Sequence, residues 1–334
     1  MQTSKTITDS SEDILLAVKD LRVWYPVRKL LSVIGYVKAI DGVTLAIRRG
    51  EICAIVGESG SGKTTFGKAI LRLIKPTGGE VFYKNVDISK LSERDLKWYR
   101  KETGMVQQDP YGAMPSFMSI KKILEEPLII HRYNEKPRLE RVMEALEEVK
   151  LTPPEDFINK YPHMLSGGQL QRVAIARALI LKPTLVVADE PVSMLDASVR
   201  IETLSLFKSL QKKYNLSVVY ITHDFSTAKY FSDRIAVMYA GQLVEIGPAT
   251  DIITAPKHPY TISLINVIPD PDPANRFKIK ETLQGEPPNL MEPPAGCRLH
   301  PRCPYVMEVC KNQEPPMYSI ESEHYVKCWL YANR

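Results

Sequence analysis

The sequence of 334 residues lacks a long apolar run. No stretch reaches the ~18 consecutive apolar residues of a membrane-spanning helix, so we expect a soluble, intracellular protein that meets a membrane only through a partner. A secretory signal is also missing, because residues 1–14 are polar and partly acidic. These residues predict a short disordered tail.

The sequence has little excess charge and no internal repeat. Its 44 Lys and Arg residues nearly balance 39 Asp and Glu residues, for a net charge of +5. A nucleic-acid-binding surface needs clustered basic residues, so we expect no nucleic-acid partner. The hydrophobic content of 44% is typical of a globular protein with a core. The length predicts two or three structural units.

The first quarter of the chain has the apolar pattern of strands followed by a helix. Residues 15–56 predict three strands, with turns at the Asp-Gly pair 41–42 and the Arg-Gly pair 49–50. After residue 62 the apolar period becomes helical, and the pattern ends near the Lys-Pro-Thr-Gly-Gly run 75–79.

The middle of the chain is predicted to be helical and then mixed. Residues 92–182 are mostly helical by apolar spacing. Residues 184–250 return to alternating strands and helices, with helices over 197–213 and 225–231. From Pro269 the sequence becomes proline-rich, which indicates a linker and a separate appendage. The overall pattern predicts an α/β fold.

A phosphate-binding loop follows the predicted strand that ends at residue 56. The loop matches G-x-x-x-x-G-K-[ST] between a strand and a helix, which is the context that this motif requires. Its backbone N–H groups and the helix N-terminus attract phosphate. Lys63 is expected to contact the outer phosphates of ATP, and Thr64 to bind Mg²⁺. The nucleotide-binding candidates here are Gly57, Glu58, Ser59, Gly60, Ser61, Gly62, Lys63, Thr64 and Thr65.

Two carboxylates end a second buried-strand pattern, at residues 185–190. Asp189 is expected to hold Mg²⁺, directly or through water. Glu190 is expected to act as the general base that polarises the attacking water. A solvated acidic turn would be as good an interpretation of this pair alone, but not behind a phosphate-binding loop.

The run Leu165-Ser166-Gly167-Gly168-Gln169 resembles the signature of ABC-transporter ATPases. The resemblance covers residues 15–255. It implies that Ser166, Gly167, Gly168 and Gln169 form a second anion site, at a helix N-terminus, that faces the γ-phosphate held by a partner subunit. Two ATP molecules would then lie between two head-to-tail cassettes, and closure of the dimer would move the membrane subunits.

Further family motifs follow in order. Tyr25 stands where an aromatic residue stacks on adenine, although a simple strand aromatic is the alternative. Gln108 resembles the glutamine that senses Mg²⁺ and the transmembrane partner, with Gln107 as the alternative. His223 matches the histidine that contacts the γ-phosphate. Ser193 to Asp196 resembles the loop that crosses the dimer, except that Met194 replaces a small residue.

The resemblance also implies a domain organisation. After a disordered tail at 1–14, the ABC ATPase domain would span 15–255, as a RecA-like core with an antiparallel β subdomain and a helical signature subdomain at about 100–182. A small cysteine-rich appendage would occupy 256–334. The expected catalytic residues are Lys63, Gln108, Glu190 and His223, and the expected Mg²⁺ ligands are Thr64, Gln108 and Asp189.

Four of the five cysteines lie in residues 297–328, and these are Cys297, Cys303, Cys310 and Cys328. Clustering in an intracellular protein argues against disulfides. Four thiolates suit a [4Fe–4S] cluster or Zn²⁺, and unliganded thiols are the third possibility. This segment resembles the C-terminal domain of oligopeptide and dipeptide importer ATPases, and that resemblance implies the [4Fe–4S] cluster.

The importer resemblance includes the run His-Pro-Tyr-Thr at 258–261. It implies a peripheral subunit on the cytoplasmic face of the cell membrane. The implied partners are a second ABC ATPase in a heterodimer, two permeases and an extracytoplasmic solute-binding protein. The long hairpin near residues 26–40 resembles the second of the paired ATPases. An oligosaccharide importer of the same subgroup, an exporter and a soluble ABC protein of translation or DNA repair are the alternatives.

Overall fold

The computed structural model describes residues 13–30, 32–267, 283–321 and 323–332. The described chain divides into two compact units. The first unit is built from 1–48, 52–90 and 221–334, and the second from 49–51 and 91–220. The predicted disordered tail at 1–14 lies almost wholly outside the described residues, as does the first part of the proline-rich linker.

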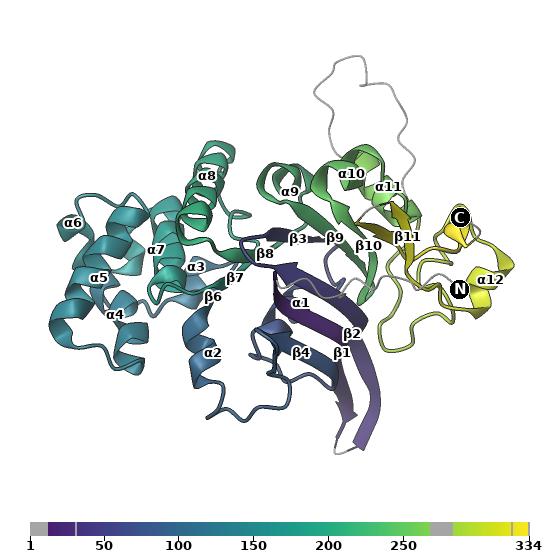
Figure 1. The fold of residues 1–334 in the computed structure, drawn as a ribbon, viewed down its shortest axis with the longest axis horizontal. Coiled ribbons are helices and arrows are strands. Elements are labelled where there is room, and N and C mark those ends of the chain that lie inside the picture. Colours follow the sequence, from purple (N-terminus) through teal and green to yellow (C-terminus); the bar gives the residue numbers. More distant parts are fainter. Residues whose placement is uncertain (1–12, 31, 268–282, 322, 333–334) are drawn as a thin grey trace, which may run out of the picture. The chain divides into compact units, whose positions relative to one another are not determined.

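The first unit begins with an antiparallel sheet of order β2-β1-β4-β5. Its strands are β1 (Ile14–Lys29), β2 (Ser32–Arg48), β4 (Gly78–Tyr83) and β5 (Val86–Asp87). Strands β1 and β2 form a long hairpin (Figure 1), which agrees with the predicted hairpin.

The predicted turn at Asp41-Gly42 is wrong, because β2 runs through it. Leu21 pairs with Val43 and Arg22 pairs with Asp41, so Gly42 is the extra residue of a β-bulge. Its φ of 80° suits glycine. Pairing with β1 therefore keeps as strand a dipeptide that would make a turn in isolation.

A second group of strands in this unit has the order β11-β12-β10-β9-β3. Strands β3 and β9 are parallel, whereas the other neighbours are antiparallel. All residues of β3 and β9 are buried, as expected for strands covered on both faces. The strands are β3 (Ile52–Val56), β9 (Arg234–Tyr239), β10 (Gln242–Pro248), β11 (Tyr318–Glu321) and β12 (His324–Val326).

The helices of the first unit include the one that follows the phosphate-binding loop. This helix, α1 (Lys63–Ile70), ends earlier than the sequence predicts, and β4 already begins at Gly78. Arg72 turns the chain with a φ of 55°, and its Nε donates to the Ile88 carbonyl over 2.9 Å. The other helices are α9 (Phe225–Phe231), α10 (Ala249–Thr254), α11 (Pro259–Val267), α12 (Glu308–Asn312) and the 3₁₀ turn Trp329–Tyr331.

The second unit joins three strands to a set of helices. The strand order is β8-β7-β6, with β6 (Thr103–Val106), β7 (Leu185–Asp189) and β8 (Ser217–Thr222). Helices α4, α5 and α7 pack against one another (Figure 1). The helices are α2 (Lys97–Glu102), α3 (Pro110–Ala113), α4 (Ile120–Ile130), α5 (Glu135–Glu148), α6 (Glu155–Ile158), α7 (Gly167–Leu179), α8 (Ala197–Tyr214) and the 3₁₀ turn Pro162–Met164.

The C-terminal segment is attached to the first unit by a strand and a buried carboxylate. Strand β12 pairs with β10, where Val326 lies opposite Glu245. Glu245 is fully buried, and it accepts the backbone N–H groups of Lys257 and His258 and the Nε2 of His324 at 2.7, 2.9 and 2.8 Å. A buried carboxylate is tolerated when several donors satisfy it, so these contacts hold the segment in place.

Candidate active site

The phosphate-binding loop links β3 to α1, as predicted. A side chain at Gly57 would place its Cβ 2.2 Å from the Met238 carbonyl oxygen, and one at Gly62 would lie 2.3 Å from the Ala39 carbonyl oxygen. Neither contact is possible for a real Cβ, and Gly62 also has a φ of 103°. The loop therefore keeps this shape only with glycine at these two positions.

Lys63 lies inside the loop rather than in solvent. Its side chain is buried, and Nζ donates to the carbonyl oxygens of Gly57 and Glu58, both at 2.8 Å. These two contacts satisfy the ammonium while leaving it where an outer phosphate could replace them. Within the described residues, the buried Ser61 Oγ has no hydrogen-bond partner. Thr64 is exposed and Thr65 half-buried.

Two other candidates of the first unit are accessible to a ligand. His223 is exposed and stands between β8 and α9, whose first turn is capped by Asp224 through a 2.8 Å bond from the Ser226 N–H. Tyr25 on β1 keeps 39% of its surface exposed. An exposed aromatic ring on a strand can stack on a base.

The two predicted carboxylates close the end of β7 in the second unit. Asp189 is buried, with 5% of its surface exposed, and Glu190 follows in the left-handed region at φ 45°. This conformation is uncommon outside glycine and is found at functional sites. Gln108 Nε2 donates to Glu190 Oε2 over 3.1 Å.

The signature residues begin helix α7. Ser166 caps the helix by accepting the Gln169 N–H at 3.3 Å, and Gln169 Oε1 accepts the Ser166 N–H at 3.1 Å, a reciprocal capping box. A Cβ on Gly167 would meet nothing within 4 Å, whereas one on Gly168 would lie 2.8 Å from Val199. The helix N-terminus is therefore open at Gly167.

The loop after Glu190 is held by local bonds. The Ser193 Oγ donates to the Glu190 carbonyl oxygen over 3.0 Å, and the Leu195 N–H donates to the Val192 carbonyl oxygen over 3.2 Å. Met194 leaves 62% of its surface exposed. The residue that departs from the family pattern is thus free to meet a neighbouring molecule.

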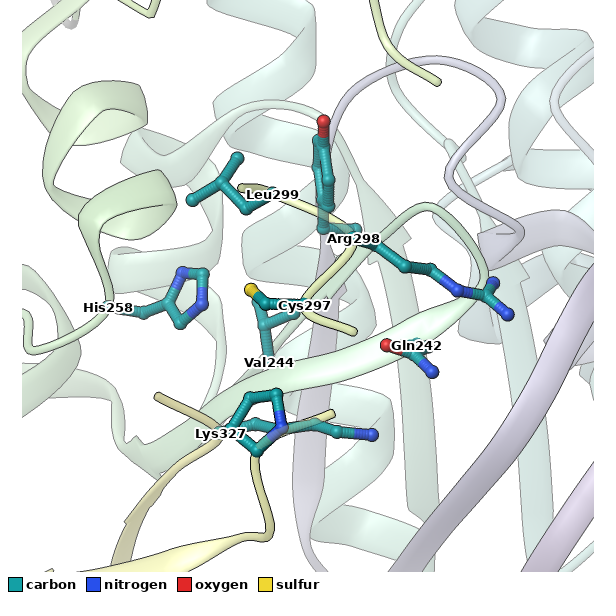
Figure 2. A pocket seen from close by; sticks show the side chains of 9 residues that line it. Gln242, Val244, His258, Cys297, Arg298, Leu299 and Lys327 are labelled. Atoms are coloured by element: carbon teal, nitrogen blue, oxygen red, sulfur yellow. The ribbon is translucent and has the colours of Figure 1, made fainter. Parts of the chain in front are cut away.

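The four C-terminal cysteines come together in the first unit. The Cys297 N–H donates to the Cys310 carbonyl oxygen over 2.8 Å. Burial raises the pKa of the Cys297 and Cys303 thiols, and raises that of Cys328 to about 12, with the neighbouring thiols adding to each rise. Cys297 also lines a small cavity together with His258 (Figure 2).

The positions of the described side chains bear on whether these thiols can hold a metal ion. In the ranges that the structure describes, no group of three or more His, Cys, Asp or Glu side chains is placed to hold a metal ion. Thiols are the donors that soft metals prefer, but the described side-chain positions do not form a site for one.

Comparison with known proteins places these residues in a family. The ABC transporter family matches residues 40–193, and the C-terminal region of oligopeptide/dipeptide transporters matches residues 244–310. The oligopeptide transport ATP-binding protein AppF of Bacillus subtilis is 40% identical over 98% of this chain and 100% of its own length. The chain belongs to the oligopeptide/dipeptide ABC transporter ATP-binding proteins.

Another relative and a solved structure are also similar to this ABC ATP-binding protein. The putative oligopeptide transport ATP-binding protein YkfD of Bacillus subtilis is 44% identical over 96% of both chains. The dimeric post-hydrolysis structure of the cassette MJ0796 with ADP and Pi has a TM-score of 0.63, at 33% identity over 70% of this chain and 99% of that one. The ABC cassette fold predicted from the sequence is therefore confirmed.

Across the parts of the chain that the structure describes, no helix combines the length and apolar composition needed to cross a bilayer.

Sequence reasoning missed two residues beside the phosphate-binding loop of this ABC ATPase. Tyr260 and Arg302 both contact Glu58. The His-Pro-Tyr-Thr run is part of the importer resemblance, but only the folded chain brings its tyrosine to the loop. No sequence pattern pointed to Arg302.

Proposed function

We propose that this chain is the ATP-hydrolysing subunit that drives peptide import through an ABC transporter. The observation that carries this proposal is the joint match, in one chain, of an ABC cassette and an oligopeptide/dipeptide C-terminal region. Relatives named as peptide import and oligopeptide transport proteins extend over nearly the whole chain. An oligosaccharide importer of the same subgroup is the alternative.

The phosphate-binding loop would hold the triphosphate. Its amides, from Gly57 to Thr65, point at phosphate oxygens in this class of site. The Lys63 ammonium, now on two carbonyl oxygens, would exchange them for the β- and γ-phosphates. His223 would contact the γ-phosphate, and Tyr25 would stack on adenine.

The second unit would supply Gln108, Asp189 and Glu190 for the metal and the attacking water, and the phosphate-binding loop would add Thr64. Thr64, Gln108 and Asp189 offer hydroxyl, amide and carboxylate oxygens, the hard donors that Mg²⁺ prefers. Because Gln108 uses its Nε2 on Glu190, its amide oxygen remains available to a cation. Mg²⁺ would neutralise charge that develops on the phosphates. Glu190 would take a proton from the attacking water.

The signature residues Ser166 to Gln169 would complete the site of a second cassette. The open N-terminus at Gly167 leaves room for a phosphate that the partner binds. The dimeric MJ0796 structures support such pairing for this fold. The partner would be a second ABC ATPase in a heterodimer.

The remaining partners and boundaries are part of the same proposal. Closure of the ATPase dimer would move two permeases, and an extracytoplasmic solute-binding protein would deliver peptide to them. The chain would be a peripheral subunit on the cytoplasmic face of the membrane. The proposed boundaries remain 15–255 for the ATPase domain, about 100–182 for the helical subdomain and 256–334 for the C-terminal domain.

We further propose that Cys297, Cys303, Cys310 and Cys328 bind a [4Fe–4S] cluster that stabilises the C-terminal domain. The four thiols are the donor set of such clusters, and the backbone bond from the Cys297 N–H to the Cys310 carbonyl oxygen supports the proximity of two of them. Protein purified without oxygen should contain iron and sulfide in a ratio of four each per chain, with loss in Cys328→Ser. Stoichiometric zinc without iron would replace this proposal with the Zn²⁺ alternative.

Peptide uptake tests the main function. Cells that depend on the transporter should stop importing labelled peptide when the chain carries Glu190→Gln, and the ATPase rate should fall by about a hundredfold or more. Glu202→Gln, an exposed carboxylate of the same unit that pairs with Arg172, is the matched control and should behave like wild type. Normal uptake by Glu190→Gln would overturn the assignment.

A further inference from the structure

The C-terminal region holds one residue of the phosphate-binding loop from two sides. The Tyr260 hydroxyl, from α11, accepts the Glu58 backbone N–H at 2.8 Å. Arg302, from the cysteine-bearing segment, lies with Nη1 3.4 Å from Glu58 Oε2. Backbone and carboxylate of Glu58 are thus fixed by separate side chains that follow the cassette in the sequence.

Arg302 is itself anchored, which makes the contact more than a surface ion pair. Its side chain is 9% exposed. Its Nε donates to the Gln284 carbonyl oxygen at 3.2 Å, and Nη1 also donates to the Tyr239 hydroxyl at 3.3 Å. The guanidinium lies 5.9 Å from the centre of the Tyr239 ring, and that ring packs on Tyr260 at 4.5 Å. An arginine held in this way loses little side-chain entropy on pairing.

The charge of Glu58 matters because of where the residue stands. It is the second residue of a loop built to bind a polyanion, and 30% of its side chain remains exposed. A carboxylate without a counter-charge there would repel the triphosphate, and partial burial means that solvent and salt would screen this repulsion less than at an exposed site. Arg302 supplies the opposite charge and holds the carboxylate toward the C-terminal segment.

We propose that Arg302 is a positioning residue of the nucleotide site, through which the C-terminal segment sets the affinity of the phosphate-binding loop for ATP. This proposal rests on the proposed function of the loop. Arg302 acts through Glu58: it neutralises the carboxylate and, with Tyr260, fixes the loop. The segment that carries the cysteines is then a working part of the ATP site rather than an attached appendage.

The test is nucleotide affinity of the full chain, measured by equilibrium binding of MgATP and MgADP. Arg302→Gln should raise the Kd for MgATP about two- to fivefold, the upper part of the range of a partly screened ion pair, with a smaller rise for MgADP, which carries less charge. Arg302→Lys should restore most of the affinity. Adding Glu58→Gln to Arg302→Gln should also restore it, because the unpaired carboxylate is then gone.

Controls separate this effect from a general loss of structure. Lys311→Gln removes an exposed cation of the same segment, paired with Glu308 at 2.9 Å, and should leave Kd unchanged. The proposal would be overturned if Arg302→Gln bound MgATP normally. It would also be overturned if the loss of MgATP affinity persisted when Glu58→Gln was added. Lys63→Ala should abolish MgATP binding whether residue 302 is Arg or Gln, so this variant tests the proposed function separately.

Discussion

At the scale of single residues, His258 shows how deeply the C-terminal region is built into the first unit. The imidazole is fully buried, and its Nδ1 accepts the Tyr260 N–H at 3.2 Å. Burial lowers the pKa of His258 to about 4, against the opposing effect of the Glu245 carboxylate, with Lys327 as the other charged neighbour. The folded protein thus keeps a neutral ring where an unfolded chain would be protonated.

This burial predicts a pH-dependent stability. The unfolded imidazole binds a proton below about pH 6.5, and the folded one only near pH 4. The free energy of unfolding should therefore fall as pH drops through this window, by about 3 kcal/mol from this group. His258→Asn retains an acceptor for the Tyr260 N–H without the titration. Urea unfolding between pH 7 and 4 should show a flatter pH dependence for the variant, and equal slopes would contradict the prediction.

At the scale of elements, a substitution at the N-terminus of α7 can distinguish the contribution of this helix end to folding from its contribution to nucleotide binding. A Cβ on Gly167 meets nothing within 4 Å, and Gly167 is not among the glycines with positive φ. Gly167→Ala should change the free energy of unfolding by less than about 1 kcal/mol. If Gly167 faces a phosphate of the partner, the added methyl should still lower ATPase activity at least about tenfold, as measured by phosphate release.

Gly62→Ala provides the contrasting case. Its Cβ would lie 2.3 Å from a backbone oxygen at a φ of 103°, so this variant should lose stability by more than about 2 kcal/mol as well as activity. A Gly167→Ala chain with full ATPase activity would show that the open end of α7 does not meet nucleotide.

Elements were predicted well from sequence where local pattern decides them. The strand–loop–helix around Lys63 and the helices over 197–213 and 225–231 agree with the structure to within one residue at their predicted ends, apart from the early end of α1. The family motif predicts Gln108, and the carboxylates that end the buried-strand pattern at 185–190 predict Glu190. These features depend on a few neighbouring residues.

The features that sequence could not predict depend on distant partners. The turn expected at Asp41-Gly42 became a bulge because β1 pairs across it. Arg302 stands 244 residues from Glu58, and no periodicity or motif connects two such positions. The position of Arg302 next to Cys303 in the sequence does not predict a contact with the phosphate-binding loop.

At the scale of the whole molecule, the proposed function gives a single chain two incomplete halves of an ATP site. The first half would use the phosphate-binding loop and Glu190, and the second the signature at the open end of α7. In the proposed dimer, each ATP touches the first half of one chain and the second half of another. In the absence of the second ATPase, turnover by the purified chain should then need two of its own copies to pair, and its rate per chain should rise with protein concentration before reaching a plateau.

Mixing two inactive variants gives the sharper test. Gly167→Ala damages only the signature half and Glu190→Gln only the hydrolytic half. A mixed dimer keeps one intact site, made from Glu190 of the first variant and Gly167 of the second. Random pairing should therefore restore up to about a quarter of the wild-type ATPase rate, whereas either variant alone stays inactive. If wild-type turnover were independent of concentration and the mixture stayed inactive, each chain would have to hydrolyse ATP without a partner's signature.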